Sequence, residues 1–290
     1  MSTKHPIISV TGSSGAGTST VKKTFDQIFR REGITSVSIE GDAFHRYNRA
    51  DMRAELERRQ ADGDHTFSHF SYDANELGEL ERVFRDYSQT GKGRTRTYVH
   101  DAEEAKRTGV PPGEFTAWAP FPDDSDLLFY EGLHGSVVND NVNLAALADL
   151  KIGVVPVINL EWIQKIHRDR ESRGYSTEAV TETILRRMQA YVHCICPQFS
   201  ETDINFQRVP VVDTSNPFVA RWIPTPDESL VVIRFKNPRG IDFPYLMSMI
   251  EGSWMTRANS LVIPGGKMDL AMQLIFTPMV IRLVREAKRA

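Results

Sequence analysis

A glycine-rich stretch near the start of the chain has the residue types of a phosphate-binding loop. GSSGAGTST occupies residues 12–20 and directly follows the apolar run PIISV. Glycines let backbone N–H groups turn towards phosphate oxygens, and the helix that follows aims its positive end at them. The pattern G-x-x-x-x-G-K-[ST] fits Gly12, Gly17 and Ser19, but threonine stands at position 18 where the pattern has lysine. An ordinary Gly/Ser turn is the alternative.

We predict a nucleoside triphosphate site here, because the loop follows a predicted strand and opens a predicted helix. The hydroxyl of Ser19 is placed to bind Mg²⁺. Another residue then has to supply the positive charge that lysine would carry. The predicted nucleotide-binding residues are Gly12, Ser13, Ser14, Gly15, Ala16, Gly17, Thr18, Ser19 and Thr20.

Two acids follow predicted strands. Asp42 comes after the strand at 36–39, in EGDAFHRYNR, and Glu131 ends the apolar strand DLLFY. Phosphoryl-transfer enzymes hold their metal at such a strand end, and they use a carboxylate to accept the proton of the attacking hydroxyl. We therefore predict Glu131 as the metal acid and Asp42 as the base. The alternative interpretation of each residue is an ordinary, solvated acid in a loop.

Two basic segments could recognise phosphate. His45, Arg46 and Arg49 closely follow Asp42, and arginine forks pair with phosphate oxygens, so an acceptor that already carries a phosphate would suit them. EWIQKIHRDRESRG places residues 161, 165, 168 and 169 on one helix face. This helix resembles a closing lid, and Lys165 or Arg168 could replace the missing lysine. A solvated basic face is the alternative.

The segment RTRTYVHD alternates its larger polar side chains. Arg94, Arg96, Tyr98 and His100 share one face of an extended strand and could bind a sugar phosphate, or they could belong to a surface hairpin. Cys194 and Cys196 exclude a disulfide framework, make a weak metal site and favour a cytosolic protein.

Length and patterning predict one doubly wound α/β domain. Strands alternate with helices after the glycine loop, and IGVVPVI at 152–158 reads as a buried parallel strand. We expect a mixed, mostly parallel sheet over residues 1–290, with a C-terminal strand and helix extension from about residue 209. The net charge of −3 argues against nucleic-acid binding, and no apolar run approaches the roughly 18 residues that a membrane helix needs.

In this order the pieces resemble the phosphoribulokinases, and more widely the uridine-kinase-like P-loop kinases. The glycine loop alone is unspecific, whereas the combination of D-x-x-H-R-x-x-R, Y-x-H and K-x-x-R-D-x-x-x-R-G is much more specific. The matching stretches span about residues 6–218, and they are PIISVTGSSGAGTST, SIEGDAFHRYNR, FSHFSYDANEL, RTYVHD, LLFYEGLHG, INLEWIQKIHRDRESRGYS and TDINFQRVPVVDTSNPF.

The resemblance implies a role for each candidate residue. Asp42 is the catalytic base, Glu131 binds Mg²⁺ and Asp169 is a second active-site carboxylate. His45, Arg49, Tyr98 and His100 surround the ribulose phosphate. Lys165, Arg168 and Arg173 are phosphate and lid contacts, and we count Lys165 and Arg168 with the catalytic residues and Arg173 with the substrate-binding ones.

The resemblance also implies the mode of regulation. Length and Thr18 match the bacterial type. The resemblance implies that enzymes of this type are activated by NADH, are inhibited by AMP and assemble as homo-octamers. Plant-type enzymes carry a regulatory cysteine in the loop, where this chain has Ala16. Arg234 and Arg257 are candidate regulatory contacts.

The implied reaction is ATP-dependent phosphorylation of D-ribulose 5-phosphate at O1 by a cytoplasmic Calvin-cycle enzyme. Two alternatives stay open: a uridine-kinase-like enzyme with another small acceptor, and a nucleotide-sensing switch without an acceptor. The basic cluster after Asp42 argues against a nucleoside, and no N-K-x-D pattern supports a guanine-binding switch.

Overall fold

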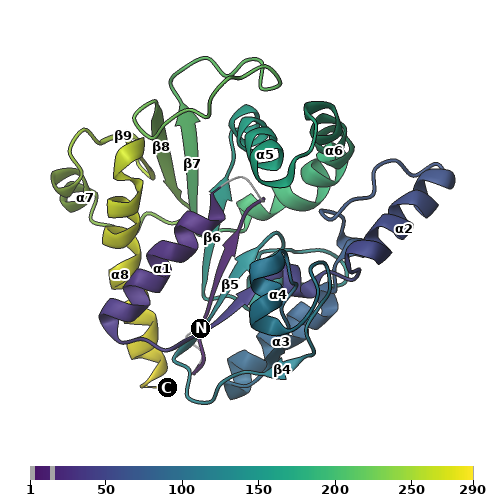
Figure 1. The fold of residues 1–290 in the computed structure, drawn as a ribbon. Coiled ribbons are helices and arrows are strands. Elements are labelled where there is room, and N and C mark those ends of the chain that lie inside the picture. Colours follow the sequence, from purple (N-terminus) through teal and green to yellow (C-terminus); the bar gives the residue numbers. More distant parts are fainter. Residues whose placement is uncertain (1–3, 14–16, 290) are drawn as a thin grey trace.

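The computed structural model describes residues 4–13 and 17–289, without the side chains at 19, 172 and 173. In this part of the chain, eight strands form one sheet in the order β2-β5-β1-β6-β7-β8-β10-β9 (Figure 1). Neighbouring strands from β2 to β7 pair in parallel, and the remaining pairs are antiparallel. The strands are β1 (Ile7–Thr11), β2 (Ser36–Glu40), β5 (Leu127–Gly132), β6 (Leu150–Val155), β7 (Ile204–Pro210), β8 (Ser229–Phe235), β9 (Trp254–Arg257) and β10 (Ser260–Pro264).

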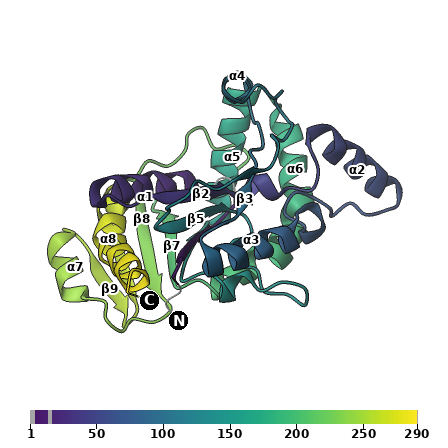
Figure 2. The same ribbon diagram turned by 90° about the horizontal axis from the view of Figure 1, so that it is seen from below.

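Helices cover both faces of the sheet. On one face, α1 (Thr18–Glu32) and α8 (Met268–Ala287) lie side by side, and their buried apolar residues join those of β1, β5 and β7 in one cluster (Figure 2). On the other face, α3 (Leu77–Thr90) packs on β1, β2 and β5. This confirms the predicted doubly wound, mostly parallel fold with a C-terminal extension, whose strands the structure shows to be antiparallel.

The remaining elements surround the sheet. None of the helices within the described ranges combines the length and hydrophobicity that crossing a membrane requires. The elements that surround the sheet are α2 (Arg49–Ala61), α4 (Ala102–Thr108), α5 (Ile158–Arg173), α6 (Thr177–Ala190), α7 (Phe243–Met249) and the two-stranded sheet of β3 (Arg94–Thr95) and β4 (Ala119–Pro120).

Strand and helix boundaries differ from the sequence prediction at α5. The predicted strand 152–158 ends at Val155, and α5 already begins at Ile158. Asn159 therefore lies inside the helix, and Val157 occupies the N-cap position without a side-chain cap. The reason is that Pro156 stops the strand, since proline has no N–H to donate to a neighbouring strand. Strand β5 ends at Gly132, one residue beyond Glu131, where the prediction ended it.

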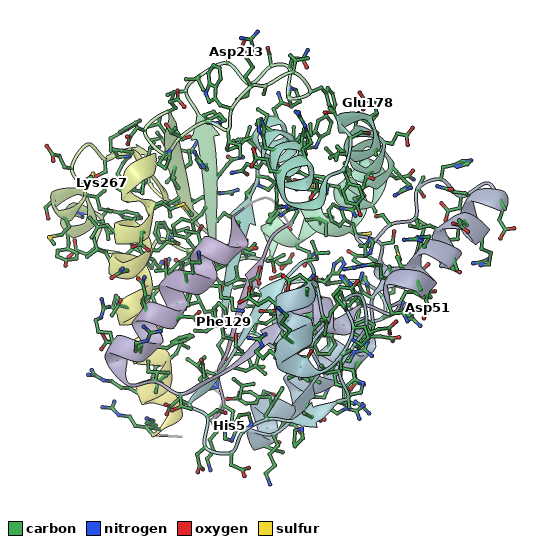
Figure 3. The ribbon with its side chains drawn as sticks, viewed as in Figure 1. His5, Asp51, Phe129, Glu178, Asp213 and Lys267 are labelled. Carbon is green, nitrogen blue, oxygen red and sulfur yellow. The ribbon has the colours of Figure 1, made fainter. Side chains whose placement is uncertain are left out.

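An aromatic cluster joins α1 to the sheet and to α8. Phe25 is fully buried, and its ring centroid lies 5.7 Å from that of Phe29, 5.0 Å from Phe129 and 4.9 Å from Phe276. Figure 3 places Phe129 in the interior beside α1, whereas Asp51, Glu178, Asp213 and Lys267 lie at the periphery. The cluster fixes α1, whose first turn follows the glycine loop.

We expect Phe25→Ala to lower the free energy of unfolding by about 3–5 kcal/mol, because it removes a ring from contact with three others and leaves a cavity. Urea unfolding followed by circular dichroism measures this. Phe25→Leu is the control and should cost less than half as much, since it keeps most of the buried volume. Equal losses for the two variants would contradict the cavity argument.

Candidate active site

The carboxyl ends of the central parallel strands bring the predicted residues to one edge of the sheet. Thr11 of β1 pairs with Gly132 of β5, and Glu40 of β2 pairs with Glu131 of β5. The glycine loop follows β1 and the turn with Asp42 follows β2, so both adjoin Glu131. Such an edge is where open α/β sheets bind their ligands.

The glycine loop is anchored at both of its ends. The N–H of Gly12 donates to the carbonyl of Gly132 at 3.1 Å, and Gly17 enters α1 with a left-handed backbone (φ 101°) that glycine adopts without strain. Thr20, whose N–H donates to the carbonyl of Gly17, is exposed in the first turn. Ser14, Gly15, Ala16 and the side chain of Ser19 lie outside the described residues.

Thr18 supplies a hydroxyl where the pattern has lysine. Its side chain is buried, and its methyl carbon would lie 2.7 Å from a Cβ placed on Gly12. Its hydroxyl hydrogen-bonds to the carboxylate of Glu131. Thr18 therefore orients the metal candidate, and the positive charge has to come from elsewhere.

Glu131 is the carboxylate that could bind a metal ion. Burial raises its pKa, although the hydrogen bond from Thr18 and the charge of Lys22 act in the opposite direction. Lys22, one helical turn beyond Thr18, forms an ion pair with Glu40. Mg²⁺ binds through one or two carboxylates, water and substrate phosphates, so a single acid beside a phosphate loop fits this ion.

Ser13 joins the glycine loop to α5. Its hydroxyl donates to Glu161, and both side chains are buried. Burial raises the pKa of Glu161, against the hydrogen bond from Ser13 and the charges of Lys165 and Arg187. A cavity of about 110 Å³ opens beside this contact, and its lining includes Gly17, Thr20 and Glu161.

Asp42 is held between two histidines. It lies in the 3₁₀ turn Gly41–Phe44, with His45 Nε2 at 3.1 Å from Oδ1 and His100 Nε2 at 3.4 Å from Oδ2. Burial alone would raise the pKa of Asp42, but the charge and hydrogen bond of His45, together with His100 and His69, hold it well below its usual range. Asp42 is therefore ionised at neutral pH.

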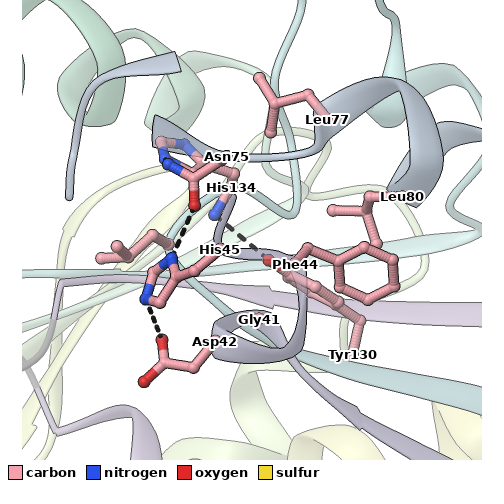
Figure 4. A pocket seen from close by; sticks show the side chains of 10 residues that line it. Gly41, Asp42, Phe44, His45, Asn75, Leu77, Leu80, Tyr130 and His134 are labelled. Atoms are coloured by element: carbon pink, nitrogen blue, oxygen red, sulfur yellow. Dashed lines mark hydrogen bonds and ion pairs between the residues drawn. The ribbon is translucent and has the colours of Figure 1, made fainter. Parts of the chain in front are cut away.

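Asn75 determines the protonation of His45 (Figure 4). The Asn75 amide nitrogen donates to the carbonyls of His69 at 2.9 Å and Ser71 at 2.8 Å, and it also lies 3.2 Å from His134 Nε2. Its Oδ1 atom, 2.9 Å from His45 Nδ1, can only accept. Since Nδ1 donates to Asn75 and Nε2 faces the Asp42 carboxylate, His45 carries both protons.

Electrostatics agree with a charged His45. Burial on its own would lower the pKa of His45, but Asp42 and the hydrogen bond to Asn75 raise it overall. The neighbouring His134 ring is buried, which lowers its pKa to about 3, so it stays neutral beside the imidazolium.

The segment 94–100 contributes two of its four alternating side chains. The ring of Tyr98 packs on those of His100 and His45, at centroid distances of 5.0 and 6.1 Å. Arg94 pairs instead with Glu79 at 3.0 Å, and Arg96 hydrogen-bonds to backbone carbonyls. The regular strand β3 ends at Thr95, but the side chains still contact shared rings: Arg94 and Arg96 lie 5.0 and 4.8 Å from the ring centroid of Trp118, and Arg96 and Tyr98 both contact Phe115.

Arg49 also lies beside His100. Its Nη2 atom donates to the His100 carbonyl at 2.9 Å, and its backbone N–H donates to Gly113 at 2.8 Å. The guanidinium is exposed, with four further N–H donors for a ligand.

Helix α5 carries a buried ion pair. Lys165 binds Asp169 one turn later, and Arg168 Nε lies 3.5 Å from Asp169 Oδ1. Burial and the charge of Arg187 lower the pKa of Lys165 to about 8, while Asp169 acts in the opposite direction. The side chain of Arg173, the last residue of α5, lies outside the described residues.

Sequence reasoning missed Arg187, Asn75 and Lys22. Arg187 of α6 acts electrostatically on His45, His69, Lys165 and Glu161, and its guanidinium lies over Phe70 at 5.3 Å. Its position on a separate helix gave no sequence signal. Lys22 could have been found, because it lies four residues after Thr18 on the same helix face.

Arg234 and Arg257 lie at the opposite end of the strand order from β2. Arg234 of β8 and Arg257 of β9 both pair with Ser260 of β10, and both are exposed. The fold thus brings them close to each other on the antiparallel extension.

Comparisons with known proteins agree with this arrangement. The model of the phosphoribulokinase / uridine kinase family matches residues 7–215. Phosphoribulokinase 2 of Cereibacter sphaeroides is 81% identical over 290 residues, which is 100% of this chain and 99% of the relative. Phosphoribulokinase of Nitrobacter vulgaris is 70% identical over 287 residues, 99% of each chain.

A solved structure extends the similarity to the fold. The phosphoribulokinase from Rhodobacter spheroides aligns with a TM-score of 0.91 and 77% identity, and the match covers 98% of this chain and 99% of the other. The chain therefore belongs to the phosphoribulokinase / uridine kinase family.

Proposed function

We propose that this chain transfers the γ-phosphoryl group of ATP to O1 of D-ribulose 5-phosphate, giving ribulose 1,5-bisphosphate and ADP, the reaction that supplies the acceptor of carbon dioxide in the Calvin cycle. Full-length similarity to proteins named phosphoribulokinase supports the substrate. The observation that carries the proposal is an ionised Asp42 between two histidines, at the sheet edge that also holds the phosphate loop.

Asp42 receives the proton of the C1 hydroxyl. Its lowered pKa makes it a weak base, so it acts mainly by orienting the hydroxyl for in-line attack and by accepting the proton late. A loose phosphoryl-transfer transition state places little demand on base strength, which fits this arrangement.

The acceptor phosphate is assigned to Arg49 and Arg173, with the rings of His45, Tyr98 and His100 around the sugar. The exposed guanidinium of Arg49 and the positive charge on His45 support this assignment. A charge-assisted pair with phosphate is stronger than a neutral hydrogen bond, so the cluster favours a phosphorylated sugar over a nucleoside.

The donor side is assigned to the glycine loop and α5. The cavity beside Gly17 and Glu161 supports placing the nucleotide on this side, and Lys165 and Arg168, which both contact Asp169, are assigned to the phosphates. Glu131 and Ser19 are the protein groups for Mg²⁺, which when bound neutralises charge on the phosphates. Closure over the site excludes water, which would otherwise consume ATP.

Regulation and assembly form a further part of the proposal. We assign NADH activation to the neighbourhood of Arg234 and Arg257, which flank Ser260 on an exposed part of the extension. A homo-octamer in the cytoplasm, without nucleic-acid or membrane partners, is the corresponding expectation for the assembled protein, and the eight-stranded sheet supports reading the chain as one kinase domain.

The proposed activity predicts which acceptor stimulates turnover. Purified protein with Mg·ATP should release ADP rapidly when D-ribulose 5-phosphate is added, whereas uridine and ribose 5-phosphate should leave the rate near background. NADH is included in parallel reactions, so that a missing activator is not mistaken for missing activity. Stimulation by uridine alone would replace the substrate, and nucleotide binding without any stimulation would favour a switch.

Asp42→Asn should lower kcat by roughly 10²–10⁴-fold and leave ATP affinity unchanged, since the amide keeps the shape but cannot accept the proton. Steady-state kinetics and equilibrium binding of a fluorescent ATP analogue measure the two quantities. Asp51→Asn, an exposed acid in the first turn of α2, is the control and should match the wild type. Activity of Asp42→Asn within about tenfold of the wild type would remove Asp42 from the role of base.

The His45–Asp42 ion pair gives folding stability a pH dependence of definite sign. The folded-state pKa of His45 is above its ordinary 6.5, so the contribution is complete below that value and is lost as pH rises through the raised pKa. The stability difference between wild type and His45→Gln should therefore be largest near about pH 6 and shrink towards about pH 9. Urea unfolding at several pH values measures it, with the exposed His193→Gln as control. A difference that grows with pH would contradict the pairing.

A further inference from the structure

Arg96 contacts the backbone of the turn that carries Asp42. Its Nε atom donates to the carbonyl of Ala43 and its Nη2 atom donates to the carbonyl of His45, both at 2.8 Å. Ala43 directly follows Asp42, and His45 is the histidine that faces the Asp42 carboxylate. One guanidinium therefore spans the turn on both sides of Phe44.

These two bonds complete the hydrogen bonding of the turn. The carbonyls at the end of a helix have no partner within it, and the turn Gly41–Phe44 is a single 3₁₀ turn. The Asp42 carbonyl accepts from His45 N–H at 3.2 Å, and the Phe44 carbonyl accepts from Glu76 N–H at 2.7 Å. Arg96 satisfies the remaining two carbonyls between residues 42 and 45.

The guanidinium is itself held in place by aromatic rings. Its central carbon lies 3.7 Å from the ring centroid of Phe115 and 4.8 Å from that of Trp118. Partial burial lowers the pKa of Arg96, and Glu76 and Glu79 act in the opposite direction. A flat guanidinium with several donors can stack on a ring and bridge two carbonyls, whereas the single ammonium of lysine cannot do both.

Arg96 also connects two parts of the acceptor site. It lies two residues before Tyr98 and four before His100, whose Nε2 atom is 3.4 Å from Asp42 Oδ2. The same side chain therefore fixes the turn with Asp42 relative to the segment that supplies His100. Loss of Arg96 would remove these two bonds between the turn and the segment 94–100, while the bonds of Phe44 to Glu76 and of His45 to Asn75 remain.

We propose that Arg96 is a positioning residue of the active site, which holds Asp42 and His45 in register with Tyr98 and His100 through the two carbonyls of the turn. This inference rests on the proposed function, because a phosphoryl acceptor has to meet Asp42 in a defined orientation. Misplacement of a reacting group by about 1 Å can cost about 10²-fold in rate.

The test compares Arg96→Ala and Arg96→Lys with Arg94→Ala. Arg94 is the matched control. It lies on the same segment, and its guanidinium carbon is 5.0 Å from the ring centroid of Trp118, but it pairs with Glu79 and not with the turn. We expect Arg96→Ala to lower kcat with ribulose 5-phosphate roughly 10²-fold while KM for ATP stays within about twofold. Arg96→Lys, which keeps the charge and most of the volume, should lose nearly as much, and Arg94→Ala should match the wild type.

Chemical rescue separates positioning from a general effect on folding. Guanidinium chloride at about 20–50 mM, well below the molar concentrations that unfold proteins, should restore part of kcat in Arg96→Ala. It should restore nothing in Arg96→Lys, whose side chain fills the space, and methylammonium should not replace it. Wild-type kcat in a folded Arg96→Lys, or loss in Arg96→Ala without rescue and with equally impaired ATP binding, would overturn the proposal.

A readout without substrate keeps this inference distinct from the proposed reaction. In protein labelled at histidine, the pKa of the His45 imidazole should fall towards 6.5 in Arg96→Lys, because Asp42 no longer lies at 3.1 Å. The NMR signal of His45 is identified as the one that is missing from the spectrum of His45→Gln. An unchanged His45 pKa would count against positioning, whereas wild-type protein that ignores ribulose 5-phosphate would count only against the substrate.

Discussion

The candidate site depends on keeping Asp42 ionised in a half-buried position. Burial favours the neutral carboxyl, and nearby positive charge has to outweigh it. His45 supplies that charge only if both of its ring nitrogens are protonated, which the Asp42 carboxylate favours most and the Asn75 amide supports by accepting from Nδ1. The amide in turn needs the carbonyls of His69 and Ser71. The charge state of Asp42, which follows β2, thus depends on the backbone of the loop with His69 and Ser71, about thirty residues away in the sequence.

The threonine in the glycine loop has a different partner, the carboxylate of Glu131. Glu131 lies on the strand next to that of Asp42, and Thr18 gives it a hydrogen bond without filling the position with a fixed charge. The cations Lys165 and Arg168 are contributed by α5, where Asp169 binds them. On the proposed assignment, the positive charge for the transferred phosphate comes from α5 and not from the glycine loop. Such an arrangement couples charge stabilisation to the position of α5, and the contact between Ser13 and Glu161 is the place where the two elements meet.

Local patterns in the sequence predicted the elements of the fold, but they did not predict the contacts between distant segments. Apolar strands, Gly33 as the end of α1 and the carboxyl-end positions of Asp42 and Glu131 follow from periodicity and turn chemistry. Strand alternation assigned Arg96 to the same face as Tyr98, and both contact Phe115, but it did not predict that the guanidinium binds the carbonyls of another loop. Arg187 reaches the site only through the packing of α6, and no spacing rule connects residue 187 with residue 45. The role of the Asn75 amide depends on the carbonyls of His69 and Ser71 that surround it, and the sequence pattern does not predict these contacts.

Charge balance also argues for the kind of acceptor. The charged His45, the exposed guanidinium of Arg49 and the nearby Arg187 gather around Asp42, so the acceptor side carries more positive than negative charge. On the proposed assignment, a phosphorylated acceptor adds negative charge beside His45 and Arg49, which a neutral nucleoside does not. In the proposed reaction, the phosphate of the sugar compensates this positive charge, while Asp42, which lies beside His45 and His100, meets the hydroxyl. On this proposal the preference for a phosphorylated acceptor is electrostatic, and it is stronger where less water screens the charges.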